Sequence, residues 1–259
     1  MTQFHGWCQA ADYQVGQAHI RVLSCVPANS QVGLEATALI VPSHYAAEEH
    51  VARVLKNLGK PQAADLIKGK LPTTKSIRSG DLGEIYATQW VAEQSGGYQV
   101  PIKRLRWKDH RNMAMRGDDV IGIAQTQGSP VLRFLKVEAK SRATLAAGVL
   151  NDARTALDKD GGLPSPHALT FISARLVELG NTDLADAIDA TQLKTGVQPQ
   201  TVTHLTFTFS GNGPAALLQK ALQAYAGPFA QWAIGLRVDG HGAFVAAVYD
   251  RVIVNADNN

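Results

Sequence analysis

Residues 116–142 constrain the fold more than any other part of this 259-residue chain. Two short runs rich in apolar and β-branched residues, 120–123 and 131–140, lie on either side of a Gln-Gly-Ser-Pro turn at 127–130. Runs of this length bounded by Gly and Pro are typical of strands. The segment therefore predicts two neighbouring strands that pair as a hairpin within a sheet.

Charged side chains stand at one end of this predicted hairpin. Asp118 and Asp119 open the first run, and Glu138 and Lys140 close the second. Because successive side chains of a strand point to opposite faces, Glu138 and Lys140 share one face. Pairing of the two strands would bring Asp119 close to Glu138. We therefore expect two carboxylates and an ammonium group at one end of the sheet.

This set of groups suits metal-dependent cleavage of a phosphodiester. Mg²⁺, or Mn²⁺ in its place, prefers oxygen ligands, and a bound divalent ion generates a nucleophile from water near neutral pH. The hypothesis is that Asp119 and Glu138 bind the metal, while Lys140 orients the attacking water and offsets charge on the phosphate. The alternative is an ordinary half-buried strand with Lys136, Glu138 and Lys140 facing solvent.

The helix predicted over residues 79–94 carries a further candidate ligand. Glu84 lies off the apolar stripe of this helix, beside the small residues Gly83 and Ala87, which would let the helix approach a sheet closely. A second interpretation makes Asp81 and Glu84 a capping box at the start of the helix. Both interpretations remain open from the sequence.

A basic cluster precedes the acidic pair. Its residues could grip phosphates, and Trp107 within it could stack on a base. Charge runs are also common on solvated surfaces, so the binding role rests on the position of the cluster beside the proposed site. The candidate nucleic-acid-binding residues are Lys103, Arg104, Arg106, Lys108, Arg111 and Arg116.

Composition limits the class of protein. The net charge of +3 is low for a protein that coats DNA, so contact with nucleic acid should be local or shared with a partner. Two cysteines and no C-x-x-C pair exclude a disulfide scaffold and a cysteine-based zinc site. The absence of a signal peptide and of a long apolar run predicts a cytoplasmic protein with no membrane contact.

Hydrophobic periodicity predicts the remaining elements. We divide the chain into an N-terminal region, 1–75, that could dock a partner, and a main domain, 76–259. His241, in a predicted hairpin turn, has no partner at ligand spacing and is interpreted as structural, and the glycine loop at 210–214 is interpreted as a helix cap. The expected strands are 19–26, 34–41, 98–107, 201–209, 232–238 and 243–254, and the expected helices are 42–58, 62–67, 79–94, 143–158, 167–179, 182–188 and 214–225.

These motifs resemble the PD-(D/E)XK nuclease superfamily. Asp119 matches the first acid of its pattern, Glu138 the second and Lys140 the lysine, and Glu84 matches a carboxylate that often reaches the metal from the preceding helix. The sequence departs from the pattern in having Asp118, not proline, before the first acid; Asp119 is the favoured ligand because it borders the apolar run. The resemblance implies a mixed α/β fold, with a restriction-endonuclease-like α-β-β-β-α-β core and a central mixed sheet flanked by helices.

A closer resemblance is to the HamA family, the nuclease subunits of the two-component Hachiman anti-phage defence system. It lies in the chain length and in the segments G-D-L-G-E at 80–84, G-D-D-V-I-G at 117–122 and V-E-A-K-S at 137–141. The resemblance implies a bacterial DNase effector held by a HamB-like helicase partner and released by damaged or phage DNA. The residues alone leave two alternatives open, a restriction or repair endonuclease and a non-catalytic DNA-binding or assembly subunit.

Overall fold

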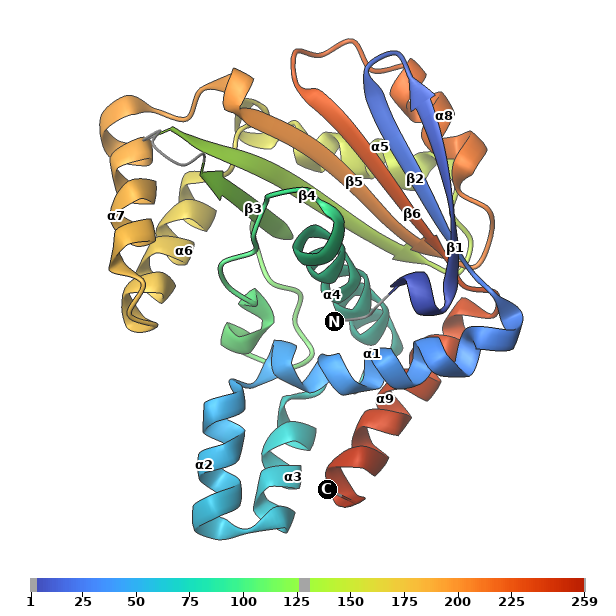
Figure 1. Cartoon of the computed structure of the whole chain (residues 1–259), viewed down its shortest axis with the longest axis vertical. Helices are drawn as coiled ribbons and strands as arrows, with labels where there is room; N and C mark the ends of the chain where they lie inside the picture. The colour runs from blue at the N-terminus through green and yellow to red at the C-terminus, as the bar shows by residue number, and fades with distance from the viewer. Residues whose placement is uncertain (1–3, 126–130, 259) are drawn as a thin grey trace.

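The computed structural model describes residues 4–125 and 131–258 and is built around a six-stranded mixed sheet (Figure 1). The strand order is β1-β2-β6-β5-β4-β3. The four central strands run parallel to one another, and β1 and β3 pair antiparallel at the two edges. This confirms the predicted mixed α/β fold class. The strands are β1 (Cys8–Val15), β2 (Ala18–Cys25), β3 (Val120–Gln125), β4 (Leu132–Arg142), β5 (Val202–Ser210) and β6 (Ala230–Arg237).

Helices cover both faces of the sheet (Figure 1). The alternation of side chains along β6 separates the two cores: Ile234 packs in the core with α1, α4 and α9, whereas Ala233 packs with α5 and α8. A third apolar cluster joins β3 and β4 to α6 and α7. The helices are α1 (Ser30–Tyr45), α2 (Glu48–Leu58), α3 (Lys60–Lys70), α4 (Lys75–Gln94), α5 (Ala147–Leu157), α6 (Pro166–Glu178), α7 (Thr182–Ala190), α8 (Ala215–Gln223) and α9 (His241–Asn258).

The helix α4 lies unusually close to the sheet. A Cβ atom placed on Gly83 would stand 3.0 Å from the Cβ of Ser141 on β4, and one on Gly122 of β3 would stand 3.1 Å from a methyl group of Val91. The predicted close approach through small residues is therefore confirmed. It brings the acidic residues of α4 against the end of β4.

The predicted strand 34–41 is wrong, because this segment lies within helix α1. Its buried residues include Gly33, Thr37, Ile40 and His44, which recur every three or four positions as on one face of a helix. Leu39, between them, is 71% exposed. The β-branched residues favoured a strand locally, and packing against α9 and α4 overrides that preference. The helix predicted over 42–58 accordingly begins only at Glu48, and Pro42 lies in the last turn of α1.

Two further strand predictions are wrong. Residues 98–107 form one isolated bridge, Gln99 to Ile123, and a 3-10 helix, Arg104–Trp107, because Pro101 supplies no N–H for a ladder. Residues 243–254 belong to helix α9, so the predicted hairpin with β6 is absent. His241 begins that helix and is buried, and its Nε2 lies 2.9 Å from the Ser141 hydroxyl.

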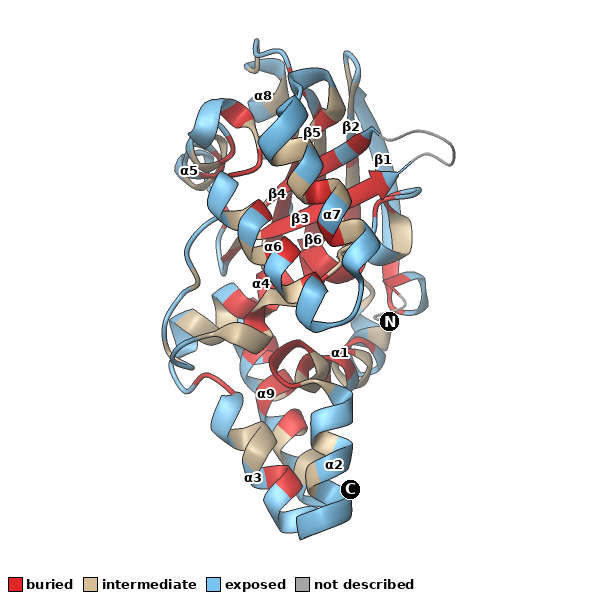
Figure 2. Cartoon of the chain, turned by 90° about the vertical axis from the view of Figure 1, so that its left-hand side faces the viewer, coloured by how far each residue is buried: buried red, intermediate tan, exposed pale blue. Residues whose placement is uncertain are grey.

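The N-terminal region is divided between two places. Strands β1 and β2 belong to the main sheet, where β2 pairs with β6. Helices α2 and α3 pack on each other and project away from the sheet, with exposed outer surfaces (Figure 2). Among the described residues, no helix combines the length and apolar character needed to span a bilayer. The predicted turn at 127–130 lies outside the described residues.

Candidate active site

Arg104 joins two acidic side chains that are distant in sequence. Its Nε donates to Oε1 of Glu84 at 2.7 Å, and its Nη2 donates both to Oε2 of Glu84 at 2.8 Å and to Oδ1 of Asp119 at 3.0 Å. Glu84 projects from α4, and Asp119 immediately precedes β3. The guanidinium therefore stands where the end of the hairpin meets the helix.

The hairpin brings its charged ends together as predicted. Val120 pairs with Val137, so Asp119 lies beside the next residue of β4, Glu138. The second oxygen of the Asp119 carboxylate accepts a hydrogen bond from the backbone N–H of Ala139 at 2.9 Å, which fixes this side chain against β4. Lys140 forms an ion pair with Glu138. Three carboxylates and two cations thus share one end of the sheet.

Burial leaves these acids poorly solvated. Burial raises the pKa of Glu84 to about 7, although Arg104 opposes the shift. Burial, followed by the negative charge of Asp119, likewise raises the pKa of Glu138 to about 7, against Lys140 and Arg104. Burial thus disfavours the charged forms of both carboxyls, and nearby positive charge favours them. Such perturbed acids are typical of functional sites and also occur in structural ion-pair networks.

Asp118 has a different environment from its neighbour. One of its carboxylate oxygens accepts a hydrogen bond from the backbone N–H of Ser165 at 2.8 Å, and the other lies 3.4 Å from Nζ of Lys136. That ammonium also donates to the carbonyl oxygens of Lys159 and Leu163 at 2.9 and 2.8 Å. Lys136 is 1% exposed, so the solvent-facing strand considered as an alternative is wrong for this residue.

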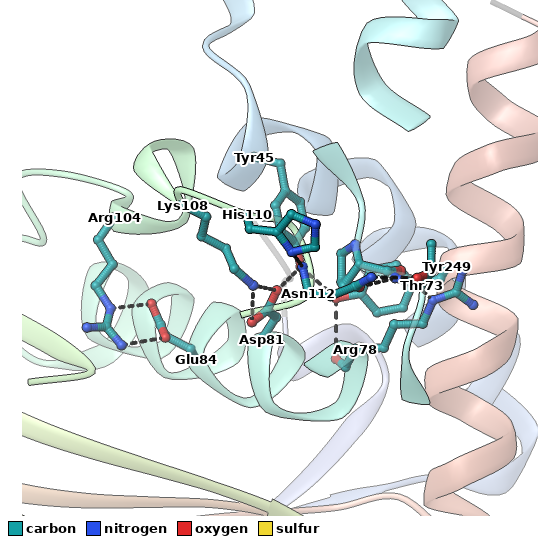
Figure 3. A network of polar contacts seen from close by, with 11 residues as sticks. Tyr45, Thr73, Arg78, Asp81, Glu84, Arg104, Lys108, His110, Asn112 and Tyr249 are labelled. Carbon is teal, nitrogen blue, oxygen red and sulfur yellow. Dashed lines mark hydrogen bonds and ion pairs between the residues drawn. The ribbon is translucent and has the colours of Figure 1, made fainter. Parts of the chain in front are cut away.

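Asp81 belongs to a second buried network, one helical turn before Glu84 (Figure 3). Its carboxylate accepts hydrogen bonds from the Tyr45 hydroxyl and from Nζ of Lys108, both at 2.7 Å for the closer oxygen. The predicted capping box is wrong, because α4 begins at Lys75 and Asp81 lies within the helix. Asp81 and Glu84 share one face of α4 at i and i+3, but no local pattern in the sequence showed that Arg104 and Lys108 would fold over that face.

The basic cluster divides into paired and exposed members. Besides Arg104 and Lys108, Lys103 donates to the Ser43 hydroxyl at 2.7 Å, and Arg106 donates to the Ser43 carbonyl at 2.9 Å. Arg111 and Arg116 are exposed. The structure therefore gives four of the six residues intramolecular partners and leaves the side chains of the other two accessible to a ligand.

A cavity of about 450 Å³ opens beside the acids. Glu84, Arg104 and Asp119 line one part of it, and apolar residues of α6 and of the 100–121 segment line much of the rest. The other polar residues of the lining are Thr88, Lys108, Asp109, His110, Arg116, Asp118 and His167. Cavities of this size, mostly apolar with a few polar groups, are the usual form of small-ligand sites. The charged cluster is thus accessible from a defined pocket.

The donor set suits a hard cation, although a guanidinium lies within it. All three candidate ligands, Glu84, Asp119 and Glu138, offer carboxylate oxygens, which Mg²⁺ and Mn²⁺ prefer. Within residues 4–125 and 131–258, no group of three or more His, Cys, Asp or Glu side chains is arranged to hold a metal ion. Arg104 instead supplies positive charge between Glu84 and Asp119.

Comparisons with known proteins agree on one family. A family model described as HamA matches residues 15–252. The Hachiman protein HamA of Bacillus cereus is 26% identical over 179 residues, which cover 69% of this chain and 62% of that relative. The match thus spans less than two thirds of the relative's length. Because the family model covers most of the chain, including every residue of the site described above, this chain belongs to the HamA family.

Proposed function

We propose that this protein is a metal-dependent DNA nuclease and acts as the effector of a Hachiman anti-phage defence complex. The convergence of Glu84, Asp119 and Glu138 with Lys140 at one end of the sheet carries the proposal. These side chains come from α4, from the residue before β3, and from β4. A buried and a partly buried carboxyl, each with a pKa of about 7, are a costly arrangement for a protein that has no use for a cation there.

Each residue of the proposed site would have its own role in phosphodiester cleavage. Glu84, Asp119 and Glu138 would hold Mg²⁺ or Mn²⁺ and supply the negative charge that retains it. When bound, the metal supplies the Lewis acid that polarises the phosphate and activates water. The backbone N–H of Ala139 holds Asp119 in place. Lys140, beside Glu138, would orient water and offset charge on the phosphate.

The defence role is supported by family membership. The relative's name places it in a Hachiman system, and the resemblance of the G-D-L-G-E, G-D-D-V-I-G and V-E-A-K-S segments implies a helicase partner. A net charge of +3 gives the chain little attraction for DNA in general, which suits an effector delivered by a partner. Helices α2 and α3, which project from the sheet, are our candidate docking region for that partner.

The proposal is tested by incubating the purified chain with supercoiled and linear DNA, in Mg²⁺ and in EDTA, with and without the co-purified helicase. We expect cutting that requires metal. In Glu138→Ala and Lys140→Ala it should fall by roughly 10²–10³-fold, the usual effect of removing one stabilising group from an active site. Arg133→Ala, an exposed position at the far end of β4, is the control and should cut normally.

Two results would contradict the proposal. Equal cutting by the wild type and Glu138→Ala would show that the acids are not the site. No cutting in any condition, with the partner present, would favour a non-catalytic subunit. Products of defined length would instead indicate the restriction or repair alternative.

A further inference from the structure

The cavity beside the acids has two chemically distinct parts. Its apolar wall includes Ile102 and Trp107, from the 100–107 segment, and Phe171 and Ile172, from α6. Its polar part includes Glu84 and Asp119 of the proposed catalytic cluster. A ligand that fills this cavity therefore needs an apolar body attached to a group that reaches the carboxylates and their metal.

The apolar wall has aromatic side chains in fixed positions. The rings of Trp107 and Phe171 meet edge to face with centroids 6.1 Å apart, and the guanidinium of Arg175 lies 5.8 Å from the first ring and 5.4 Å from the second. Both rings are only half-buried, so part of each remains available to a ligand. Aromatic walls of this kind bind the faces of nucleobases without regard to sequence.

Positive charge lines the same cavity. The exposed Arg116 contributes from the segment just before Asp118, whereas the ammonium of Lys108, in the wall, is paired with Asp81. Arg116 therefore suits a phosphate next to a bound nucleotide. The cavity thus combines an apolar slot, cations and a carboxylate cluster in one continuous space.

The size of the cavity favours an unpaired base over a base that is stacked in a duplex. Its volume of about 450 Å³ lies within the range of roughly 300–1,000 Å³ for pockets that enclose small ligands. A base that is paired and stacked in a duplex cannot enter such a pocket, because it must first leave the stack. An unpaired base has no such cost.

We propose that this cavity receives one unstacked base of a single strand, while the phosphate attached to it lies at Glu84 and Asp119. This inference rests on the proposed nuclease function and names the form of its substrate. It makes single strands and frayed ends the preferred substrates over internal duplex. It also makes Trp107 and Phe171 substrate-binding residues.

Filling the cavity tests the proposal. Ala168 on α6 lines the cavity, and Ala174 on the same helix is exposed and away from it, so Ala168→Trp and Ala174→Trp form a matched pair. Ala114, at an exposed position of another segment, also lines the cavity, so Ala114→Trp is the test variant if Ala168→Trp fails to fold. Thermal melting establishes which variants are folded.

The first readout is binding in Ca²⁺, which carboxylate oxygens can hold in place of Mg²⁺, with a gel to confirm that the strands stay intact. Fluorescence anisotropy compares a labelled single-stranded oligonucleotide, the same strand made of abasic residues, and a duplex closed by hairpins at both ends. The wild type and Ala174→Trp should bind the base-containing strand at least tenfold more tightly than the other two. The filled variants should bind the normal and the abasic strand equally and weakly. The second readout is cutting of the same DNAs in Mg²⁺.

The outcomes separate the two proposals. If the wild type cuts DNA and the filled variants bind and cut as it does, the pocket proposal is overturned while the nuclease proposal stands. The pocket proposal is likewise overturned if the wild type does not distinguish normal from abasic strands. If the binding differences appear but no DNA is cut, the nuclease proposal fails and the pocket stands. Absence of binding by the wild type overturns the pocket as well.

Discussion

Two charged networks lie on either side of one peptide bond. Asp118 joins a closed network in which the buried ammonium of Lys136 has one carboxylate and two carbonyl oxygens as partners. Asp119 joins an open one, where three carboxylates share Arg104 and Lys140, and two of the three, Glu84 and Asp119, line a cavity. The closed network satisfies its charges internally. The open network has more acids than bases.

The two networks have opposite effects on the stability of the fold. The first ties β4 to the segment between α5 and α6, and every group in it already has a partner. The second lowers the stability of the fold, since Glu84 and Glu138 give up solvation for incomplete compensation. We therefore assign the first to structure and the second to chemistry. The predictions below test that assignment.

The largest expected effect is on the closed network. Lys136→Met removes the ammonium, so Asp118 becomes an unpaired buried charge and two carbonyl groups lose their hydrogen-bond donor. The free energy of unfolding should therefore fall by about 3–5 kcal/mol. Adding Asp118→Asn to this variant should restore part of the loss. Lys159→Met, at an exposed side chain, is the control and should stay within about 0.5 kcal/mol of the wild type. Urea unfolding measures all four proteins; an unchanged midpoint for Lys136→Met would refute the structural assignment.

The open network should make the metal-free protein less stable as the pH rises. Glu84 and Glu138 ionise near 4.5 when unfolded and near 7 when folded, so between these values the folded protein retains protons that the unfolded chain has released. Stability should therefore fall from about pH 4.5 to pH 7 and level off above, by up to roughly 3 kcal/mol for each carboxyl.

Urea unfolding in EDTA at pH 5 to 8 measures this slope. Glu138→Gln should make the slope shallower, because a neutral amide has no proton to release, while Glu84 still contributes. Glu178→Gln, at an exposed acid on α6, should leave it unchanged. A slope in Glu138→Gln as steep as in the wild type would show that Glu138 is not a strained acid.

The smallest expected effect concerns the contact between α4 and the sheet. A Cβ on Gly80 meets nothing within 4 Å, so Gly80→Ala should stabilise the protein by about 0.5–1 kcal/mol through helix propensity. A Cβ on Gly83 presses on Ser141, so Gly83→Ala should fall about 1–3 kcal/mol below Gly80→Ala. Gly83→Ala should also lower DNA cutting, because Glu84 moves with the helix. Equal stability of the two variants would show that the close approach is not needed.

Local patterns in the sequence were sufficient for the hairpin and for its charged end. The alternation of apolar residues in β4, and the acids at its boundary, are short-range signals, and the register of two adjacent strands follows directly from them. The same holds for α4, whose small residues predicted the close contact with β4. These predictions depended on neighbouring residues alone.

Long-range packing decided the rest. Residues 34–41 and 243–254 are rich in Val, Ile and Ala, and as parts of α1 and α9 they pack against each other and against α4. The pairing of Arg104 with Glu84 needs the 100–107 segment to fold over α4, which no local pattern shows. For the same reason the sequence could not separate Asp118 from Asp119, whose partners come from different parts of the fold.

Binding of Mn²⁺ tests the central claim most directly, because it needs neither DNA nor a partner. Electron paramagnetic resonance of the free ion, during titration with protein at pH 8, gives the bound fraction. The wild type and Asp118→Asn should bind Mn²⁺, and Asp119→Asn and Glu138→Gln should bind at least tenfold more weakly. Equal binding by the wild type and Asp119→Asn would contradict the claim that the open network is a metal site.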